Sequence, residues 1–343
     1  MRWTLLENKA LLQVKDLQHS IGVDEHIAQL LVKRGVTTFE DAKRFFRPAL
    51  DQLHDPFLMK GMAEACQCIL QKREERKPVM VYGDYDVDGT TSVALMSTYL
   101  KSLDIEVLSY IPDRYEEGYG VSYKGIDCAK ANGIDLIIAL DCGIKAVDKV
   151  SYAKSLGIDF IICDHHRPGD AVPEAIAVLD PKQQDCTYPY DELCGCGVGF
   201  KLVQALQTKL GQPQKDIYKY LDLVATAIGS DIVPITGENR VLAHFGLKLI
   251  NAKKRPAFKA ILDNVKKKEL TITDVVFMIG PRINAAGRMK HGLLATELLC
   301  ETDVEKVRAL AKDIEAYNAN RKETDRSITE EALQLIKDKN EED

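Results

Sequence analysis

Hydrophobic residues recur along the chain with two different periods. In residues 22–76 they follow helical spacing, as at Ile27, Leu30 and Leu31, which predicts helices. From residue 77 onward, short apolar runs without polar alternation appear, and the first three gaps between them have a helical pattern. Because strands of this kind are buried on both faces, the pattern predicts an α/β fold, a parallel five-stranded sheet flanked by helices. The predicted strands are VMVY (79–82), IEVLSY (105–110), DLIIAL (135–140), DFIIC (159–163) and AIAVL (175–179).

The C-terminal part of the chain is predicted to be helical. Helical spacing returns at about residue 196, and residues 303–338 contain neither Gly nor Pro. At about 1.5 Å per residue, this last segment would form one helix of roughly 50 Å. We therefore expect an N-terminal helical segment (1–76), a domain containing the sheet and further helices (77–300), and a long connector helix (301–343) leading to a second domain that this chain lacks.

Composition adds expectations about where the protein acts. The net charge is −6 over 343 residues, so the overall charge does not attract nucleic acid, and any polyanion must be bound locally. No run of about eighteen apolar residues occurs, and the first residues lack the apolar core of a signal peptide. The nine cysteines are odd in number and show no C-x-x-C spacing. We expect a soluble, cytoplasmic protein with reduced cysteines and no membrane association.

Acidic and imidazole side chains follow three of the predicted strands. They are Asp84, Asp86 and Asp88 after the first, Asp141 after the third, and Asp164, His165 and His166 after the fourth. The carboxyl ends of parallel strands meet at one edge of a sheet, where ligands bind. One acidic residue there is usually a helix cap, but this many predict a metal centre. Carboxylates with imidazole suit Mn²⁺ or Mg²⁺, and two such ions would support phosphoester hydrolysis.

The stretch DYDVDG (84–89) also resembles the start of a calcium-binding EF-hand loop. That loop follows a helix and ends on a Glu at its twelfth position. Here the twelfth position is Leu95, and the preceding residues have a strand pattern. The EF-hand is therefore excluded. We expect Gly89 to allow a tight turn into a helix that begins near Thr90.

Two later segments carry candidate residues with open alternatives. Asp231, in GSDIVP (229–234), lies where an apolar helical run ends, and is either a cap or a metal ligand. The segment GCGVGFK (195–201) lacks the last glycine of a dinucleotide-binding fingerprint, because Phe200 stands there. It is interpreted as a glycine-rich helix start.

Two other segments could hold phosphate. GPRINAAGRM (280–289) is expected to form a loop whose small residues allow close approach of a ligand to Arg282, Asn284 and Arg288. PDRYEEGYGVS (112–122) contains Arg114 and Tyr119, which could contact phosphate. The alternative interpretation of this segment is a surface loop with ordinary ion pairs.

Taken in order, DYDVDG, DCG (141–143), DHH (164–166) and GSDIVP resemble the four motifs of the DHH phosphoesterase superfamily. PDRYEEGYG and GPRINAAGR narrow the resemblance to RecJ-type exonucleases specific for single-stranded DNA. The resemblance spans nearly the whole chain. It implies a Mn²⁺- or Mg²⁺-dependent enzyme that degrades single-stranded DNA from the 5′ end, releases 5′-mononucleotides, and acts in recombination and repair.

The resemblance also implies roles for individual residues. His166 would orient its neighbour or touch the scissile phosphate, and Asp164 would be catalytic with it. The implied metal residues are Asp84, Asp86, Asp88, Asp141, His165 and Asp231. The implied contacts to nucleic acid are Arg114, Tyr119, Arg282, Asn284 and Arg288.

Implied partners are single-stranded DNA, a single-strand-binding protein and a helicase, and we expect a monomer. Family members continue into a second domain with a GGH-type motif and then an OB-type domain, so we expect this chain to bind DNA weakly and to lose polarity or processivity. Two alternatives remain: a DHH phosphodiesterase acting on short oligonucleotides, cyclic dinucleotides or pyrophosphate, and a non-catalytic Cdc45-like scaffold. The scaffold would be expected to lack metal ligands, and none is missing here.

Overall fold

Five parallel strands form the sheet, as the sequence predicts. The computed structural model describes residues 11–263, 265, 267–289 and 292–338, without the side chains of residues 288 and 289. The spatial order of the strands is β2-β1-β3-β4-β5, with all four neighbouring pairs parallel. Each strand begins at or within two residues of its predicted start. The strands are β1 (Val79–Gly83), β2 (Val107–Tyr110), β3 (Leu136–Leu140), β4 (Asp159–Cys163) and β5 (Ala177–Leu179).

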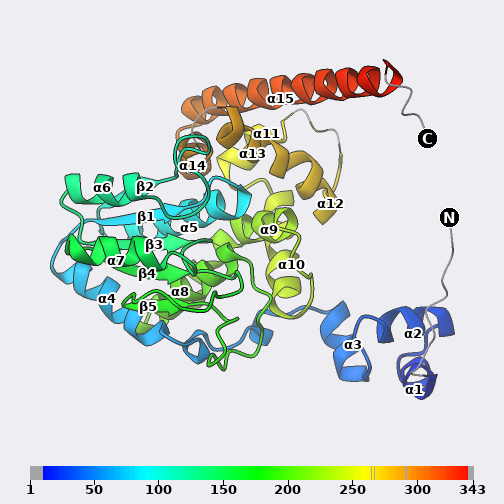
Figure 1. Ribbon diagram of the computed structural model, residues 1–343. Helices are drawn as coiled ribbons and strands as arrows, with labels where there is room; N and C mark the ends of the chain where they lie inside the picture. Colours follow the sequence, from blue (N-terminus) through cyan, green and yellow to red (C-terminus); the bar gives the residue numbers. More distant parts are fainter. Residues whose placement is uncertain (1–10, 264, 266, 290–291, 339–343) are drawn as a thin grey trace. The chain divides into compact units, whose positions relative to one another are not determined.

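Helices cover both faces of the sheet (Figure 1). On one face, α6 (Tyr123–Ala131) and α7 (Val147–Ser155) pack on side chains such as Ile137 and Phe160. On the other face, α5 (Val87–Ser102) contacts β1 and β2, while α8 (Gly195–Lys209) contacts β3 and β4. α4 (Met62–Glu74) completes that layer beside β5. Two covering layers thus explain why β1 and β3 are fully buried and apolar, whereas the edge strand β2 is partly buried.

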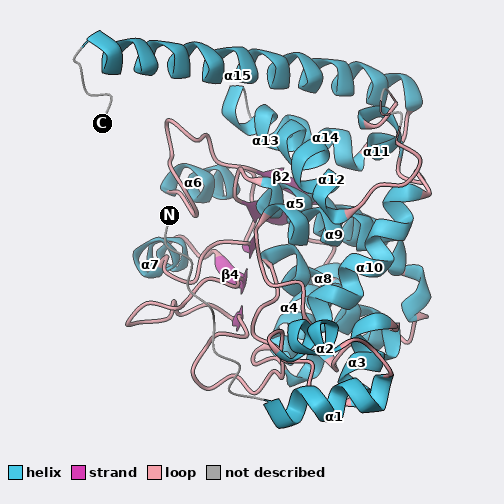
Figure 2. Cartoon of the chain, turned by 90° about the vertical axis from the view of Figure 1, so that its right-hand side faces the viewer, coloured by secondary structure: helices cyan, strands magenta, loops and turns pink. Residues whose placement is uncertain are grey.

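The chain after residue 210 is largely helical, as expected (Figure 2). α9 (Leu221–Ser230) packs against α5, α8 and α10 (Gly237–Asn251), and α13 (Gly280–Met289) packs against α15. The long helix α15 has 35 residues, Val304–Asp338, and confirms the prediction of one uninterrupted C-terminal helix. The remaining helices of this part are α11 (Pro256–Ile261), α12 (Ile272–Asp274), the π-helical turn η5 (Val275–Ile279) and α14 (Leu293–Cys300).

The chain divides into two compact units, with the division between Leu53 and His54. The first has its own small core, which includes Leu17, Leu31 and Ala42. Its helices are α1 (Leu11–Ile21), α2 (Glu25–Val32) and α3 (Phe39–Phe46). The second unit holds the sheet and everything C-terminal to it. The domain boundaries at residues 76 and 300 stay predictions.

Short 3₁₀ turns are the remaining elements. No described helix has both the length and the apolar character needed to cross a bilayer. The cysteines in the described part of the chain are all free thiols. The 3₁₀ turns are η1 (Leu50–Gln52), η2 (Pro56–Leu58), η3 (Gln214–Asp216) and η4 (Tyr218–Tyr220).

Candidate active site

The first acidic group lies where β1 turns into α5. Asp86 is the N-cap of α5, and its carboxylate accepts a hydrogen bond of 2.9 Å from the Gly89 amide. The expected helix start near Thr90 is wrong: α5 begins at Val87, so Asp88 and Gly89 lie in its first turn. A Cβ on Gly89 would lie 2.4 Å from the carbonyl oxygen of Asp84. Gly89 is therefore required for close packing rather than for a turn.

Asp88 is fixed by the start of another helix. Its two carboxylate oxygens accept hydrogen bonds from the amides of Gly195 (2.6 Å) and Cys196 (2.7 Å), at the N-terminus of α8. Unpaired amides and the helix dipole favour an anion at this position. The segment GCGVGFK does begin a helix, as predicted. Its contact with Asp88 was not predicted, and it joins residues more than 100 positions apart.

Asp141 follows β3 in a left-handed backbone conformation, with φ of 60°, which Asp tolerates better than most residues. Its amide donates to the Cys163 carbonyl at 2.8 Å, which continues the pairing of β3 with β4. A Cβ on Gly195 would lie 2.6 Å from the Asp141 Cβ. The start of α8 can therefore approach Asp141 only because residue 195 is glycine.

Asp164 organises the end of β4. Its Oδ1 accepts from the amides of His165 (2.8 Å) and His166 (3.1 Å) and lies 2.7 Å from Nδ1 of His166, and its Oδ2 accepts from the Ile144 amide at 2.9 Å. Burial favours the neutral carboxyl, but the bonds and charge of His166 and these amides outweigh it, so the pKa of Asp164 is lowered. The same pair raises the pKa of His166. Asp164 therefore sets the orientation and charge of His166.

His165 is the centre of the acidic cluster. Its Nε2 lies 3.1 Å from Oδ1 of Asp141, 3.5 Å from Oδ2 of Asp231 and 3.8 Å from Oδ2 of Asp88. Asp231 is the C-cap residue of α9, so it both ends a helix and points at His165. The ligand atoms of Asp88, His165 and Asp231 lie within 4.8 Å of one another, as do those of Asp141, His165 and His166.

Burial and mutual repulsion of the carboxylates dominate the electrostatics of this cluster. Burial, together with the neighbouring carboxylates, raises the pKa of Asp88 and Asp141 well above its ordinary value and that of Asp231 to about 6. Burial and the adjacent His166 lower the pKa of His165 to about 4, so its imidazole is neutral near pH 7. Burial also raises the pKa of Asp84 to about 7.

The hydrogen bonding of these carboxylates also indicates a site for cations. Both carboxylate oxygens of Asp141 and Oδ2 of Asp231 are buried without a hydrogen-bond donor from the described residues. Buried polar atoms in native proteins nearly always have partners. Oxygen atoms with a neutral imidazole are a donor set suited to Mn²⁺ or Mg²⁺. These residues therefore fit divalent cations.

The loop after β2 borders the site. The Tyr119 hydroxyl lies 3.5 Å from Nε2 of His166, and its ring meets that of Tyr85 edge to face at 5.8 Å. The Arg114 guanidinium lies 4.7 Å from the centroid of the Tyr85 ring. Both residues predicted in this loop thus lie beside the strand ends, with Tyr85 between them. Tyr85 was not predicted.

The segment 280–289 corrects one expectation. It was expected to be a loop, but it forms α13. Its glycines serve packing between helices and strand ends: a Cβ on Gly280 would lie 2.7 Å from Oγ of Ser230, and one on Gly287 would lie 2.6 Å from the carbonyl oxygen of Tyr85. These glycines therefore allow other parts of the protein, rather than a ligand, to approach the α13 backbone closely.

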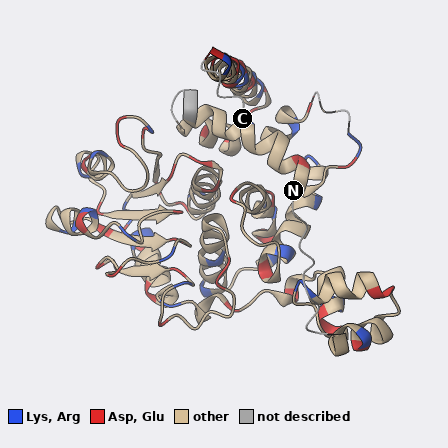
Figure 3. Ribbon diagram, turned by 45° about the vertical axis from the view of Figure 1, so that its right-hand side comes forward, with Lys and Arg blue, Asp and Glu red and all other residues tan. Residues whose placement is uncertain are grey.

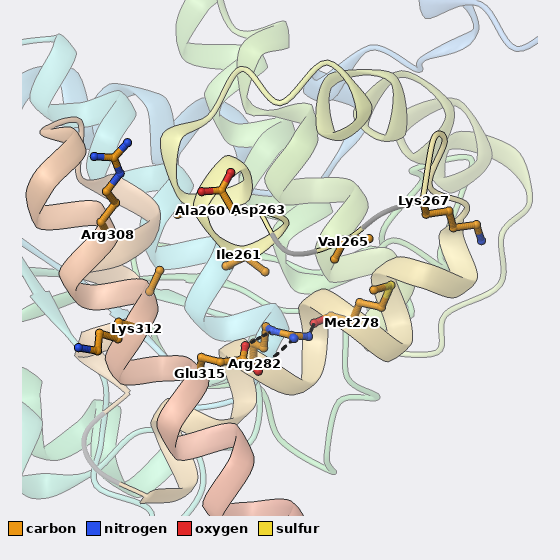
Figure 4. A pocket seen from close by; sticks show the side chains of 11 residues that line it. Ala260, Ile261, Asp263, Val265, Lys267, Met278, Arg282, Arg308, Lys312 and Glu315 are labelled. Atoms are coloured by element: carbon orange, nitrogen blue, oxygen red, sulfur yellow. Dashed lines mark hydrogen bonds and ion pairs between the residues drawn. The ribbon is translucent and has the colours of Figure 1, made fainter.

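Arg282 is engaged by α15 rather than free. Its Nε lies 2.5 Å and its Nη2 3.2 Å from the carboxylate of Glu315, and its Nη1 donates to the Met278 carbonyl (Figure 4). Asn284 lines a small cavity next to Ser230. The side chain of Arg288 lies outside the described residues. The prediction that these three residues contact nucleic acid stays a prediction.

Comparison with known proteins agrees with the fold. The DHH family, N-terminal domain, matches residues 78–228. This range contains the sheet, Asp88, Asp141 and His165.

Individual relatives make the assignment narrower. The Single-stranded-DNA-specific exonuclease RecJ of Bacillus subtilis (strain 168) is 39% identical over 338 residues, which cover 98% of this chain and 42% of that protein. The crystal structure of RecJ from Thermus thermophilus in complex with Mn²⁺ is 28% identical, with a TM-score of 0.82, and the match covers 97% of this chain and 48% of that one.

A crystal structure of exonuclease RecJ bound to manganese is 31% identical with a TM-score of 0.76, and the match covers 84% of this chain and 72% of that one. The chain belongs to the RecJ family. It spans about half the length of the curated relatives it matches.

Proposed function

We propose that this chain is the catalytic core of a divalent-metal-dependent exonuclease that degrades single-stranded DNA in the 5′-to-3′ direction. It releases 5′-mononucleotides and acts in recombination and repair. The observation that carries the proposal is the cluster of buried, unpaired carboxylate oxygens around neutral His165. Membership of the RecJ family supplies the substrate class, because its relatives are named as single-stranded-DNA-specific exonucleases.

Two Mn²⁺ or Mg²⁺ ions are the proposed cofactors. Two solved relatives carry Mn²⁺, and another carries Mg²⁺. When bound, a pair of such ions activates water and stabilises the charge that develops on a phosphoryl oxygen. The residues that would hold them are Asp84, Asp86, Asp88, Asp141, His165 and Asp231.

The remaining residues orient the substrate. Asp164 holds the Nδ1 side of His166, so Nε2 of that imidazole faces outward beside Tyr119 and can donate to a phosphate oxygen. Arg114 is placed to approach the DNA backbone from the loop after β2. Arg282, Asn284 and Arg288 are proposed contacts on α13; for Arg282, binding DNA would require release from Glu315.

The proposal also covers the cellular location, the oligomeric state and the partners of the protein. We propose a cytoplasmic monomer whose partners include single-stranded DNA, a single-strand-binding protein and a helicase. The scaffold alternative is disfavoured because all six proposed metal residues are present. The remaining alternative is that the substrate is a short oligonucleotide, a cyclic dinucleotide or pyrophosphate. Experiment can distinguish this alternative from an exonuclease that acts on single-stranded DNA.

The experiment is a substrate comparison in Mn²⁺. The protein is incubated with single-stranded DNA labelled at its 5′ or 3′ end, with a short RNA, with a cyclic dinucleotide and with pyrophosphate. We expect mononucleotides released from the 5′ end of the DNA. Hydrolysis confined to one of the small substrates would overturn the exonuclease proposal while keeping the metal centre.

A further inference from the structure

The small cavity that Asn284 lines was not predicted from the sequence. Its volume is about 140 Å³, and it is bounded by the end of α9, the π-helical turn η5, the start of α13 and helix α15. At about 30 Å³ per water molecule, this is the volume of four to five waters. It can hold a phosphate group but not a nucleotide. The residues lining it are Ser230, Val276, Gly280, Pro281, Asn284 and Arg321.

Two polar atoms at this cavity lack partners. Oγ of Ser230 and Nε of Arg321 are buried, and neither has a hydrogen-bond partner among the residues that the structure describes. The rest of the Arg321 guanidinium pairs with the exposed carboxylate of Asp325 at 3.1 Å and lies 3.5 Å from Asn318. None of the described residues that line the cavity is acidic. A guanidinium N–H and a hydroxyl that are both buried without partners indicate a place for an anion.

The cavity is adjacent to the acidic cluster. Ser230 is the last residue of α9, and the next residue, Asp231, points its Oδ2 at His165. Gly280 keeps the cavity open, because a Cβ there would lie 2.7 Å from Oγ of Ser230.

The contact between Arg282 and Glu315 holds α15 so that Arg321 lies at the cavity. This bidentate pair fixes the position of α15 along α13 (Figure 4). Arg321 follows Glu315 by six residues, about 9 Å along a helix, and lies at the same end of α13 as Gly280 and Asn284. Both basic and acidic residues occur along α15 (Figure 3), and apart from Arg321 they are exposed. Arg326, for example, is 80% exposed and pairs with Glu330. Arg321 differs from Arg326 in lining this small cavity and in being only 24% exposed.

We propose that this cavity binds one phosphate of the substrate strand, next to the scissile phosphate, with Arg321 as the main contact and Ser230 and Asn284 as neutral donors. The planar guanidinium suits phosphate oxygens because its N–H groups form a fork. This inference rests on the proposed function, since it assigns a subsite for the same DNA substrate. It also gives Arg282 and Glu315 a role in positioning α15.

The first test measures binding without metal. A fluorescently labelled oligothymidylate is titrated into the full chain in EDTA at several salt concentrations, for the wild type, Arg321→Gln and Arg321→Lys. The matched control is Arg326→Gln, the same change on the same helix outside the cavity. For single strands, each lost phosphate contact lowers the steepness of log K against log[salt] by about 0.7.

We expect Arg321→Gln to lose that increment and about tenfold in affinity, Arg321→Lys to keep the increment, and Arg326→Gln to match the wild type. An Arg321→Gln slope equal to that of the wild type, or no measurable DNA binding by the wild type, would overturn the inference. Thermal melting of each variant checks that the fold is retained.

The second test identifies the phosphate. In Mn²⁺, each protein digests strands carrying one neutral methylphosphonate at successive positions. The wild type should be slowed by a methylphosphonate next to the scissile position, whereas Arg321→Gln and Gly280→Ala should be slow on all strands and insensitive to that change. Equal sensitivity in all proteins would overturn the inference. If the wild type does not cleave unmodified DNA, the proposed function fails, and the binding test alone decides the subsite.

Discussion

Two clusters of buried ionisable residues in the same unit differ in how completely they are paired. In the first, Lys201 is fully buried, and its ammonium donates to the His54 carbonyl at 2.6 Å and to Glu238 at 3.1 Å. Glu238 also accepts from the Tyr188 hydroxyl at 2.6 Å and from the His54 amide at 2.9 Å. Each charge has its counter-charge and its hydrogen bonds, as a structural role requires.

The second cluster is the edge of the sheet around His165. There the carboxylates of Asp88, Asp141 and Asp231 converge on an imidazole that is neutral near pH 7, and buried oxygen atoms of Asp141 and Asp231 lack donors from the described chain. Such an arrangement repels itself unless a cation joins it. Incomplete pairing, rather than burial or charge alone, therefore separates a candidate metal centre from an internal ion pair.

The largest effect is expected from Asp141→Asn. Asn tolerates the left-handed backbone of residue 141 but removes a charge from the proposed metal centre. Loss of several kcal/mol of transition-state stabilisation corresponds to a fall in kcat/KM on the order of 10³-fold. Initial rates of mononucleotide release in Mn²⁺ measure it.

The matched control is Asp135→Asn, at the opposite end of the same segment, where Asp135 pairs with Lys72 at 2.7 Å and Lys77 at 3.0 Å. This variant should keep wild-type activity. Wild-type rates in Asp141→Asn would remove the basis for the metal assignment.

Breaking the paired cluster should instead affect stability. Glu238→Ala leaves Lys201 buried without a counter-charge, which costs about 3–5 kcal/mol of unfolding free energy. Urea unfolding followed by circular dichroism measures the loss, and the protein that remains folded should still cleave DNA. An exposed pair supplies the control: Glu174→Ala, which removes the partner of Lys154, should leave stability unchanged. A stable Glu238→Ala variant would show that the pairing at Lys201 does not matter.

The dependence of stability on pH should distinguish the clusters further. Burial raises the pKa of Asp231 to about 6, above roughly 3.9 in an unfolded chain. Between these values the folded protein binds a proton that the unfolded chain does not, so this contribution is present below about pH 4 and is lost as the pH rises to 6. Without metal, the wild type should lose about 2 to 3 kcal/mol relative to Asp231→Asn across this interval.

Urea unfolding of both proteins in EDTA at several pH values provides the measurement. His165, whose pKa is lowered to about 4, has the opposite dependence and is present in both proteins. Because the Asp231 charge, in addition to burial, raises the pKa of Asp88 and Asp141, the difference between the two profiles reports Asp231 together with its effect on these carboxylates. Parallel stability profiles would show that Asp231 carries no raised pKa.

The smallest effect is expected at the start of α8. A Cβ on Gly195 would lie 2.6 Å from that of Asp141, so Gly195→Ala should displace the amides that hold Asp88. Disturbing groups that orient metal ligands typically costs 10- to 100-fold, and we expect such a loss of kcat/KM together with a loss of about 1–3 kcal/mol of unfolding free energy. Gly197→Ala is the control, because its Cβ would meet no atom closer than 3.4 Å. Equal activities of the two variants would contradict the proposed contact.

The sequence predicted the sheet because strand burial leaves a local signal. β4 was predicted at its observed limits, and Asp84, Asp141 and His165 follow strands whose carboxyl ends must meet. Packing between distant segments leaves no such signal. The glycines of α13 suggested a loop. Their actual role, close packing against Ser230 and Tyr85, could not be predicted because these residues lie more than 45 positions away in the chain.

For the same reason the amides of Gly195 and Cys196 that bind Asp88, and the cavity at Arg321, became visible only in three dimensions. The sequence did contain a usable signal for α8: a glycine-rich helix start is suited to approaching another backbone closely. It did not indicate which carboxylate the helix would meet.

Titration of the metal-free protein with Mn²⁺ tests the central claim most directly. Calorimetry and thermal melting should show that the wild type binds Mn²⁺ and is stabilised by it, by about 2.7 kcal/mol at a free concentration one hundred times the Kd. Asp141→Asn should lose most of this binding, while Asp135→Asn should retain it. If the wild type gains no stability from millimolar Mn²⁺, or if Asp141→Asn gains as much as the wild type, the unpaired edge of the sheet is not a metal centre.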